Sequence, residues 1–247
     1  MEYKVETSAP WIVASESSGT VGATEQKVTL HVEWSKVPAN TAVEGTIKVS
    51  AGEGRPRTYM LGARQINIMP EEVRGFYEAD GYVAIEAADT SARTADGETH
   101  WEELPGYGAT KSAMTVFPVT VESNTDSKAA LEYRMYLYDA GDFQLQATLA
   151  PTLNFVPGRG LRFAVSVDGG PKTVVDELER NSQTDWEQAV SDGVRRVTVP
   201  LTIAQPGNHQ LEIWAFDPGV VLERIVVSHV PLLPSYLGPP ESMHFPA

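Results

Sequence analysis

The stretch Asp217-Pro218-Gly219-Val220-Val221-Leu222-Glu223-Arg224-Ile225-Val226-Val227 joins a turn sequence to a run rich in β-branched residues. Proline presets φ for a turn and glycine tolerates positive φ, so residues 217–219 favour a reversal of the chain. Valine and isoleucine favour extended backbone on a pleated surface. This stretch therefore predicts a turn over 217–219 and a β-strand over 220–227.

Seven further stretches of the C-terminal part alternate apolar and polar residues with a period of two, as strands do. They cover residues 82–87, 113–121, 131–139, 143–148, 161–168, 194–203 and 209–216. Turn sequences that suit hairpins stand between several of them, namely Asp139-Ala140-Gly141-Asp142, Asp168-Gly169-Gly170 and Pro206-Gly207-Asn208. Eight strands joined in this way predict an antiparallel jelly-roll sandwich. One short helix is expected, because Thr184-Asp185-Trp186-Glu187 fits a capping box before Gly193.

The N-terminal part also has the period of a β-structure. Alternation over 27–34 predicts Val28, Leu30, Val32 and Trp34 on one face of a strand, with His31 on the solvent face. Further short strands are expected at 43–50, 59–61 and 65–69, and together they suggest a small immunoglobulin-like sandwich. The acidic Pro- and Gly-containing segment 70–80 interrupts the alternation. We therefore predict an all-β protein with a small immunoglobulin-like β domain at 1–75 and a larger jelly-roll domain at 76–247.

Composition excludes several classes of function. The chain of 247 residues has a formal net charge of −14, so its field repels nucleic acids and anionic membrane surfaces. It contains no cysteine, which excludes disulfides, thiolate metal sites and a cysteine nucleophile. We find neither a signal-type apolar run after Met1 nor an apolar span of the ~20 residues that a membrane helix needs. We expect a globular protein without nucleic-acid or membrane partners.

Catalytic motifs are missing from the sequence. Glycoside hydrolysis needs two carboxylates facing one bond, whereas the adjacent acids Glu102-Glu103 and Asp176-Glu177 would point to opposite faces of a strand. The five histidines have no spacing that presents two imidazoles to one metal. Gly158-Arg159-Gly160 precedes a strand and not a helix, so it predicts a loop and not a phosphate cradle. These patterns favour a binding or structural role over catalysis.

Aromatic residues in polar loops are the better candidates for function. Sugars are bound by aromatic rings that stack on the pyranose and by polar groups that bond its hydroxyls. Trp101 and Tyr107 fall in the Thr/Asp/Gly-rich stretch 90–109, and Trp186 falls in another polar stretch. Each either packs onto the sandwich or serves a ligand. Trp34 and Trp214 lie within predicted strands as core or sheet-face residues, and Trp11 is expected to cover the small domain.

A family resemblance extends these observations. Its segments are Tyr82-Val83-Ala84-Ile85-Glu86-Ala87, Trp101, Gly106-Tyr107-Gly108-Ala109-Thr110-Lys111-Ser112-Ala113-Met114, Leu131-Glu132-Tyr133, Pro151-Thr152-Leu153-Asn154, Val167-Asp168-Gly169, Pro206-Gly207-Asn208-His209 and the tail from Asp217 to Ser242. In order and spacing they resemble the C-terminal domain of glycoside hydrolase family 115 over residues 76–243. Residues 11–51 resemble the β-rich module before that domain.

The resemblance implies a non-catalytic accessory region. Members of the family are α-glucuronidases that release glucuronic acid or its 4-O-methyl form from xylan, and their catalytic machinery belongs to domains N-terminal to this region. The isolated chain is therefore not expected to be an enzyme. Its parent's catalytic domain would be a partner, and an extracellular or periplasmic location follows from the polymeric substrate. The Pro-rich end Tyr236-Leu237-Gly238-Pro239-Pro240-Glu241-Ser242 is expected to close the sandwich as a strap.

The large domain also resembles the galactose-binding-like jelly-roll sandwiches of carbohydrate-binding module families 6 and 35. In those modules a first strand with Glu-Ala-Glu helps to hold a structural calcium ion, whereas this chain has Glu86-Ala87-Ala88-Asp89. The resemblance implies Glu86 and Glu223 as metal ligands, although calcium prefers six or more oxygens. It also implies Trp186 as a stacking residue for sugar, with Trp101, Tyr107 or Asp217 beside it.

Two hypotheses follow from the sequence. The first is a carbohydrate-binding module for xylan or glucuronoxylan, with the site Trp186, Trp101, Tyr107 and Asp217. The second is a structural module that buttresses the catalytic domain or forms a homodimer contact. The first predicts aromatic side chains exposed in a groove, and the second predicts buried tryptophans and an exposed apolar patch.

Overall fold

The computed structural model describes residues 1–66, 70–179 and 181–245, and these form an all-β protein with one α-helix. The described chain divides into two compact units, Met1–Met69 (unit 1) and Pro70–Ala247 (unit 2). The predicted boundary at residue 75 differs from this division because β7 (Gly75–Tyr77) pairs within unit 2 and the Arg74 backbone N–H donates to the Asn208 side chain. None of the described helices has the length and apolar character needed to cross a membrane.

Unit 1 contains two small antiparallel sheets. The larger has the order β3-β1-β5-β6, and the smaller pairs β2 with β4. These strands are β1 (Glu2–Thr7), β2 (Ile12–Ala14), β3 (Ser18–Thr20), β4 (Leu30–Val32), β5 (Ala42–Ala51) and β6 (Arg57–Arg64). A small core of Tyr3, Val5, Trp11, Ile12, Val37 and Ile47 joins them. Trp11 is thus buried, as its expected role in covering the small domain requires.

The strand predicted over 27–34 is shorter in the structure, and its proposed apolar face is wrong. Only Leu30–Val32 is extended, and Trp34 begins the 3₁₀-helix η1 (Trp34–Lys36) with its side chain 51% exposed. The cause is local, since the Lys36 N–H bonds to the Glu33 carbonyl and turns the chain. His31 is exposed as predicted. Of the strand expected at 65–69, residues 67–69 lie outside the described part of the chain.

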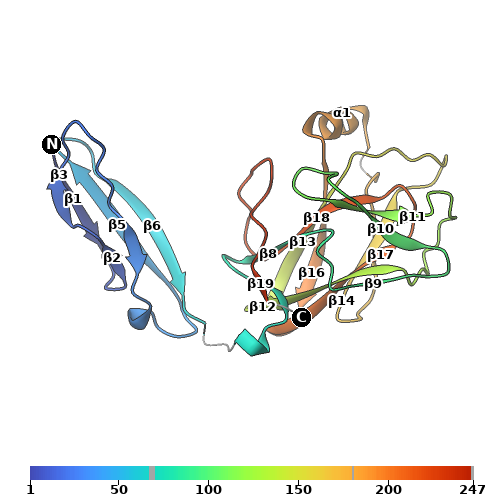
Figure 1. Cartoon of the computed structure of the whole chain (residues 1–247), viewed down its shortest axis with the longest axis horizontal. Helices are drawn as coiled ribbons and strands as arrows, with labels where there is room; N and C mark the ends of the chain where they lie inside the picture. Colours follow the sequence, from blue (N-terminus) through green and yellow to red (C-terminus); the bar gives the residue numbers. More distant parts are fainter. Residues whose placement is uncertain (67–69, 180, 246–247) are drawn as a thin grey trace. The chain divides into compact units, whose positions relative to one another are not determined.

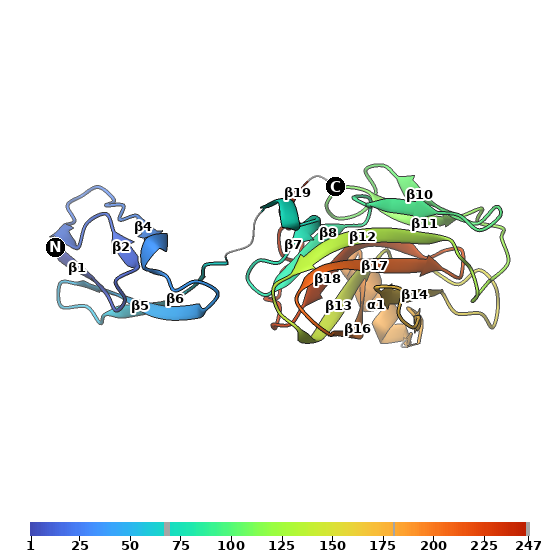
Figure 2. The ribbon, with the colours of Figure 1, turned by 90° about the horizontal axis from the view of Figure 1, so that it is seen from below.

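Unit 2 is a sandwich of two sheets with a jelly-roll course, in which the chain passes back and forth between the layers (Figures 1 and 2). One sheet has the order β10-β11-β18-β13-β16, with β8 also paired to β18, and the other has the order β15-β14-β17-β12-β7-β19, with β9 paired to β12. The strands not yet given are β8 (Tyr82–Glu86), β9 (Ala92–Thr94), β10 (His100–Leu104), β11 (Ala113–Phe117), β12 (Ala130–Leu137), β13 (Gly141–Leu149), β14 (Arg162–Val167), β15 (Thr173–Asp176), β16 (Arg195–Ile203), β17 (Gly207–Ala215), β18 (Val221–Ser228) and β19 (His244–Phe245). A 3₁₀-helix η2 (Pro70–Glu72) precedes β7.

Strand β18, formed by the stretch that predicts the fold, lies in the middle of its sheet. It pairs with β13 on one side and with β8 and β11 on the other, and all its residues are buried. Leu222, Ile225 and Val227 point into the core between the sheets. Burying such a side chain contributes about 1.5–3 kcal/mol, so a strand of this composition is stable only in the middle of a sheet.

The predicted helix is confirmed with a shifted cap. Helix α1 (Gln183–Asp192) stands at one end of the strands of unit 2 (Figure 1). Its N-cap is Ser182, whose hydroxyl accepts from the Asp185 N–H while the Asp185 carboxylate accepts from the Ser182 N–H. Gly193 ends the helix with φ of +69°, which glycine adopts without steric cost.

Candidate carbohydrate-binding site

Trp101 does not lie in a loop, and its predicted role in stacking on sugar is corrected by the structure. It belongs to β10, opposite Val116 of β11, and its side chain is only 3% exposed within the core. Its neighbours His100 and Glu102 are less buried and point away from the core, which is the alternation of an ordinary strand. The indole therefore packs between the sheets, and its ring faces are not available to a ligand.

Asp217 is also buried, with no exposed surface, so it does not contact a sugar directly. Its carboxylate accepts two hydrogen bonds from the Arg162 guanidinium, Nε to Oδ2 at 2.8 Å and Nη2 to Oδ1 at 3.1 Å. Burial by itself raises the pKa of Asp217, but the hydrogen bonds from Arg162 outweigh burial and hold that pKa below its ordinary value. Asp217 is ionised and structural, and it fixes the turn that follows it.

That turn shapes a hollow on the surface of unit 2. The carbonyl of Pro218 accepts a hydrogen bond from Arg159 Nη2 at 3.3 Å. Gly219 has φ of +100°, and a Cβ at this position would lie 2.9 Å from Cε1 of Phe155. The ring of Phe155 thus rests against bare backbone. The turn predicted from Asp217-Pro218-Gly219 is present, and it positions two side chains of a loop about 60 residues earlier.

The hollow has a volume of about 420 Å³ and is formed by two loops, one after β11 and one before β14. We call it the Phe155 pocket. Its walls are Val119, Thr120, Val121, Glu122, Ser123, Phe155, Val156 and Arg159. Within its second loop the Asn154 side chain accepts from the Val156 N–H at 2.8 Å, and the Arg159 N–H donates to the Val156 carbonyl. These bonds hold the loop in a tight turn.

The chemistry of the Phe155 pocket suits a sugar ring. Phe155 is 54% exposed and offers an apolar face on which the C–H groups of a pyranose stack. The Arg159 guanidinium lies 5.1 Å from the centre of that ring, and apart from its bond to Pro218 it donates to no described residue. It therefore retains donors in a fork that matches a carboxylate. Glu122 supplies an acceptor for hydroxyl groups.

Phe155 and Arg159 are not among the site residues predicted from the sequence. The loop predicted at Gly158-Arg159-Gly160 is confirmed, with Gly158 at φ of +78°. The available signal was an aromatic residue in the turn-rich sequence Asn154-Phe155-Val156-Pro157-Gly158. It indicates an exposed ring, but it does not reveal the turn against which that ring packs.

Trp186 and Tyr107, the other predicted sugar contacts, lie outside the Phe155 pocket. Trp186 is half-buried on α1, and Tyr107 is 46% exposed in the loop between β10 and β11. Residues of that loop and of the chain after α1, among them Thr110 and Arg196, line a second cavity together with Tyr236. Its volume is only about 20 Å³, room for a water molecule but not for a sugar. The Phe155 pocket is the better fit by size.

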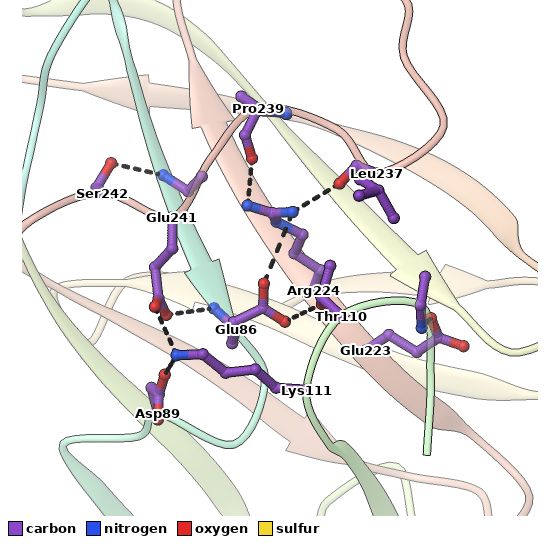
Figure 3. A network of polar contacts seen from close by, with 12 residues as sticks. Glu86, Asp89, Thr110, Lys111, Glu223, Arg224, Leu237, Pro239, Glu241 and Ser242 are labelled. Carbon is purple, nitrogen blue, oxygen red and sulfur yellow. Dashed lines mark hydrogen bonds and ion pairs between the residues drawn. The ribbon is translucent and has the colours of Figure 1, made fainter. Parts of the chain in front are cut away.

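Glu86 and Glu223 are close in space, but the donors around them do not fit calcium. Thr110 Oγ1 donates to Glu86 Oε2 at 2.5 Å, and Arg224 Nη1 lies 3.6 Å from Glu86 Oε1. The Glu223 carboxylate instead accepts from the Ala109 N–H and points away from Glu86 (Figure 3). Burial raises the pKa of Glu223, and the charge of Glu86 adds to that rise. Calcium needs six or more oxygens, whereas here a guanidinium already faces the carboxylate.

The strap, residues 236–242, completes this network. Arg224 Nη1 donates to the Leu237 carbonyl at 2.6 Å, and Nη2 donates to the Pro239 carbonyl (Figure 3). Lys111 Nζ bridges Asp89 at 2.8 Å and Glu241 at 2.6 Å. Hydrogen bonds to those two carboxylates raise the pKa of Lys111. The positive charge among these acids thus comes from side chains of the chain itself.

Comparison with protein families shows the family to which this chain belongs. Residues 75–241 match the model of the "Glycosyl hydrolase family 115 C-terminal domain". The chain belongs to glycosyl hydrolase family 115. The match runs from the start of β7 to Glu241 in the strap, and it confirms the predicted resemblance. It also confirms that the family 115 region described here is the C-terminal accessory region and not the catalytic domain.

Three solved structures are similar to part of this chain. A family GH115 4-O-methyl-alpha-glucuronidase with specificity for decorated arabinogalactans has 20% identity and a TM-score of 0.49, covering 62% of this chain and 18% of that one. A family 35 carbohydrate-binding module from Clostridium thermocellum has 15% identity and a TM-score of 0.41, covering 59% of this chain and 97% of the module. A module of Cellvibrio mixtus lichenase 5A in complex with cellotriose has 17% identity and a TM-score of 0.40, with 60% and 98% covered. Comparison with curated proteins gave no match. The chain thus spans less than a fifth of the length of the first of these proteins.

Proposed function

We propose that this family 115 chain binds xylan or glucuronoxylan through the Phe155 pocket, as an accessory domain of an α-glucuronidase. The observation that carries the proposal is the pairing of an exposed aromatic face with a guanidinium 5.1 Å from its centre. The ring stacks on a sugar, and Arg159 binds the carboxylate of a glucuronic acid branch. This positive group is informative because the chain as a whole carries a net charge of −14, which repels acidic polymers.

Affinity electrophoresis tests this function. The full chain is run through native gels that contain glucuronoxylan, unsubstituted xylan or a decorated arabinogalactan. Glucuronoxylan is expected to retard the wild type most strongly, and Phe155→Ala is expected to abolish retardation. Arg159→Gln should weaken retardation by glucuronoxylan but not by unsubstituted xylan, since only the former has the carboxylate. Unretarded migration of folded wild type in every gel contradicts a binding function for these polymers.

A surface around Trp186 and Tyr107 is the alternative candidate for sugar binding. Both expose part of an aromatic ring. If Trp186→Ala abolishes retardation while Phe155→Ala leaves it unchanged, the sugar binds at α1 and the Phe155 pocket is the wrong site. These two variants are a matched pair, because each removes one partly exposed aromatic ring.

A structural role for unit 1 is the second candidate function. It has an apolar hollow of about 290 Å³ lined by residues such as Tyr3, Leu30 and Ile47. It also exposes the aromatic side chain of Trp34 and, on β6, Tyr59 and Met60. Exposed apolar surface of this kind marks interfaces. Unit 1 would then contact the catalytic domain of the parent enzyme or a second copy of the chain, and light scattering of the purified chain distinguishes monomer from homodimer.

The proposed substrate also implies a location. Xylan is a polymer that does not enter cells intact, so a protein that binds it acts outside the cytoplasm. We propose an extracellular or periplasmic location, which fractionation of the producing cells tests.

A further inference from the structure

Three loops of unit 2 bring two carboxylates and one imidazole together at a place that the sugar proposal does not involve. Glu78 follows β7, Asp139 lies between β12 and β13, and His229 follows β18. Each offers one ligand atom, and these atoms lie within 4.8 Å of one another. They form the only such group of three among the residues that the structure describes. None of the three belongs to the walls of the Phe155 pocket.

The separations between the donor atoms suit a small divalent cation. His229 Nε2 is 3.1 Å from Glu78 Oε1 and 3.5 Å from Asp139 Oδ2. A tetrahedral zinc ion with bonds of about 2.0–2.1 Å to nitrogen and oxygen places its ligands roughly 3.3 Å apart. The observed distances lie on either side of that value. For these two pairs, binding a metal would therefore require only small movements of the side chains.

The three side chains are held in place by their surroundings. Glu78 is only 4% exposed, and its second oxygen accepts the Tyr138 N–H at 2.7 Å, which leaves Oε1 directed at the imidazole. The backbone N–H of His229 donates to the Gly81 carbonyl, and the centre of the imidazole ring lies 5.1 Å from that of the Phe143 ring. A Cβ at residue 81 would lie 3.2 Å from His229 Nε2, so glycine makes room for the ring. Such outer contacts orient metal ligands.

Charge also favours a cation. Two carboxylates approach one ring nitrogen, and that nitrogen carries at most one proton. Even with a protonated imidazole, the three groups have a net charge of −1. Because Glu78 is buried, this excess charge is costly. A divalent ion bound to neutral His229 would bring the net charge to zero.

The group is open to solvent on one side. The side chains of Asp139 and His229 are 33% and 30% exposed, and His229 also lines an open hollow of about 450 Å³ beside Phe143 and Pro200. A metal held by three protein ligands has a fourth position for water or another donor. The hollow gives such a ligand access from solution.

We propose that Glu78, Asp139 and His229 form a binding site for a divalent transition metal, with zinc as the probe ion. Nitrogen and oxygen donors of this kind suit zinc better than calcium, which takes oxygen ligands in larger number. The site would tie together the loop after β7, the turn between β12 and β13, and the chain after β18. This proposal is independent of sugar binding at the Phe155 pocket.

Isothermal titration of ZnCl₂ into the full chain, first treated with a chelator and dialysed, tests the site. The expected result is one zinc bound per chain, with at least tenfold weaker binding in Asp139→Asn and at least a hundredfold weaker binding in His229→Gln. His100→Gln is the matched control, because His100 pairs at 3.6 Å with one carboxylate, that of Glu102, on the edge strand β10. The control should bind zinc as the wild type does.

Two further measurements keep the test decisive. Circular dichroism checks that each variant is folded, and Asp139→Asn in an exposed turn serves if His229→Gln does not fold. Cobalt substitution should give visible absorption of a four-coordinate ion in the wild type and none in Asp139→Asn. Absence of zinc binding by the wild type, or binding that is unchanged in Asp139→Asn and His229→Gln, overturns the proposal.

Discussion

The Arg162 guanidinium donates two hydrogen bonds to the Asp217 carboxylate, from Nε to Oδ2 and from Nη2 to Oδ1. The Asp217 side chain is fully buried, whereas the Arg162 side chain is 30% exposed. The Arg162 backbone N–H adds a third bond to Oδ2 at 2.8 Å. This pair joins the start of β14 to the turn before β18. It thereby fixes the backbone on which Arg159 and Phe155 rest, although neither Arg162 nor Asp217 lines the Phe155 pocket.

Arg162→Ala is expected to lower the free energy of unfolding by about 3 kcal/mol at pH 7, because it leaves a buried carboxylate without its cation. The pKa of Asp217 is lowered in the folded state, so its stabilisation is present above the unfolded pKa of about 3.9 and is lost as pH falls through the folded value. Urea denaturation should therefore show a smaller difference between variant and wild type at pH 3 than at pH 7. Arg93→Ala removes an exposed pair with Glu103 and should cost less than about 1 kcal/mol. Equal effects of the two variants would contradict this account.

The contribution of Glu177 to stability is expected to depend on pH in the direction opposite to that of Asp217. Burial raises the pKa of Glu177 to about 8, partly offset by the Thr152 hydroxyl and Arg195. Between the unfolded pKa of about 4.3 and the folded value, the native state holds a proton that the unfolded state has lost. Stability should therefore fall as pH rises through this range, by up to about 1.4 kcal/mol per pH unit. Glu177→Gln removes the titrating group and should be more stable than wild type at pH 8, with little difference at pH 4.5. A variant no more stable at pH 8 would contradict the prediction.

Substitutions of Trp101 are expected to affect stability, whereas substitution of Phe155 is expected to affect sugar binding. Trp101→Ala opens a cavity in the core and is expected to cost about 3–5 kcal/mol in thermal or urea denaturation. Phe155→Ala removes a half-exposed ring and should cost less than about 1.5 kcal/mol, yet it should abolish retardation by glucuronoxylan. Trp101→Phe keeps most of the core volume and should still be retarded. Loss of retardation in a folded Trp101→Phe variant would mean that Trp101 has a role in the site.

The longer strands of unit 2 are predictable because their sequences alternate or carry β-branched runs. The alternation over 209–216 and the β-branched run over 220–227 correspond to β17 and β18, with ends that differ by one or two residues. Strand β10 was missed, since His100-Trp101-Glu102-Glu103-Leu104 is short and follows turn residues. Its pairing with β11 is what extends it, and that pairing is a contact between segments which local propensity does not report.

The site was less predictable because long-range contacts decide it. Asp217 beside Pro218 and Gly219 has the sequence of an exposed turn, and only Arg162, 55 residues earlier, explains its burial. Phe155 is exposed in a pocket because Gly219 leaves space beneath its ring. Sequence spacing shows neither relationship. Trp34, by contrast, was misassigned for a local reason, since a 3₁₀ turn replaced the expected strand.

The cations of the strap network should make calcium unnecessary. Millimolar CaCl₂ is expected to leave the melting temperature of the wild type unchanged, because Arg224 already pairs with Glu86 and Lys111 already bridges Asp89 and Glu241. Arg224→Met should lower the free energy of unfolding by about 3 kcal/mol, since it leaves Glu86 buried without its cation and removes the donor to the Leu237 and Pro239 carbonyls.

Lys111→Met tests the more exposed half of the same network and should lower the melting temperature by less than Arg224→Met does, because Lys111 is about half exposed to solvent. The pKa of Lys111 is raised in the folded state, so its contribution is present below the unfolded pKa of about 10.4 and is lost only above it. The difference between Lys111→Met and wild type should therefore be constant from pH 6 to pH 9. A calcium-dependent rise in the melting temperature of the wild type that disappears in Glu86→Gln would show instead that an ion, and not these side chains, holds the strap end of the sandwich.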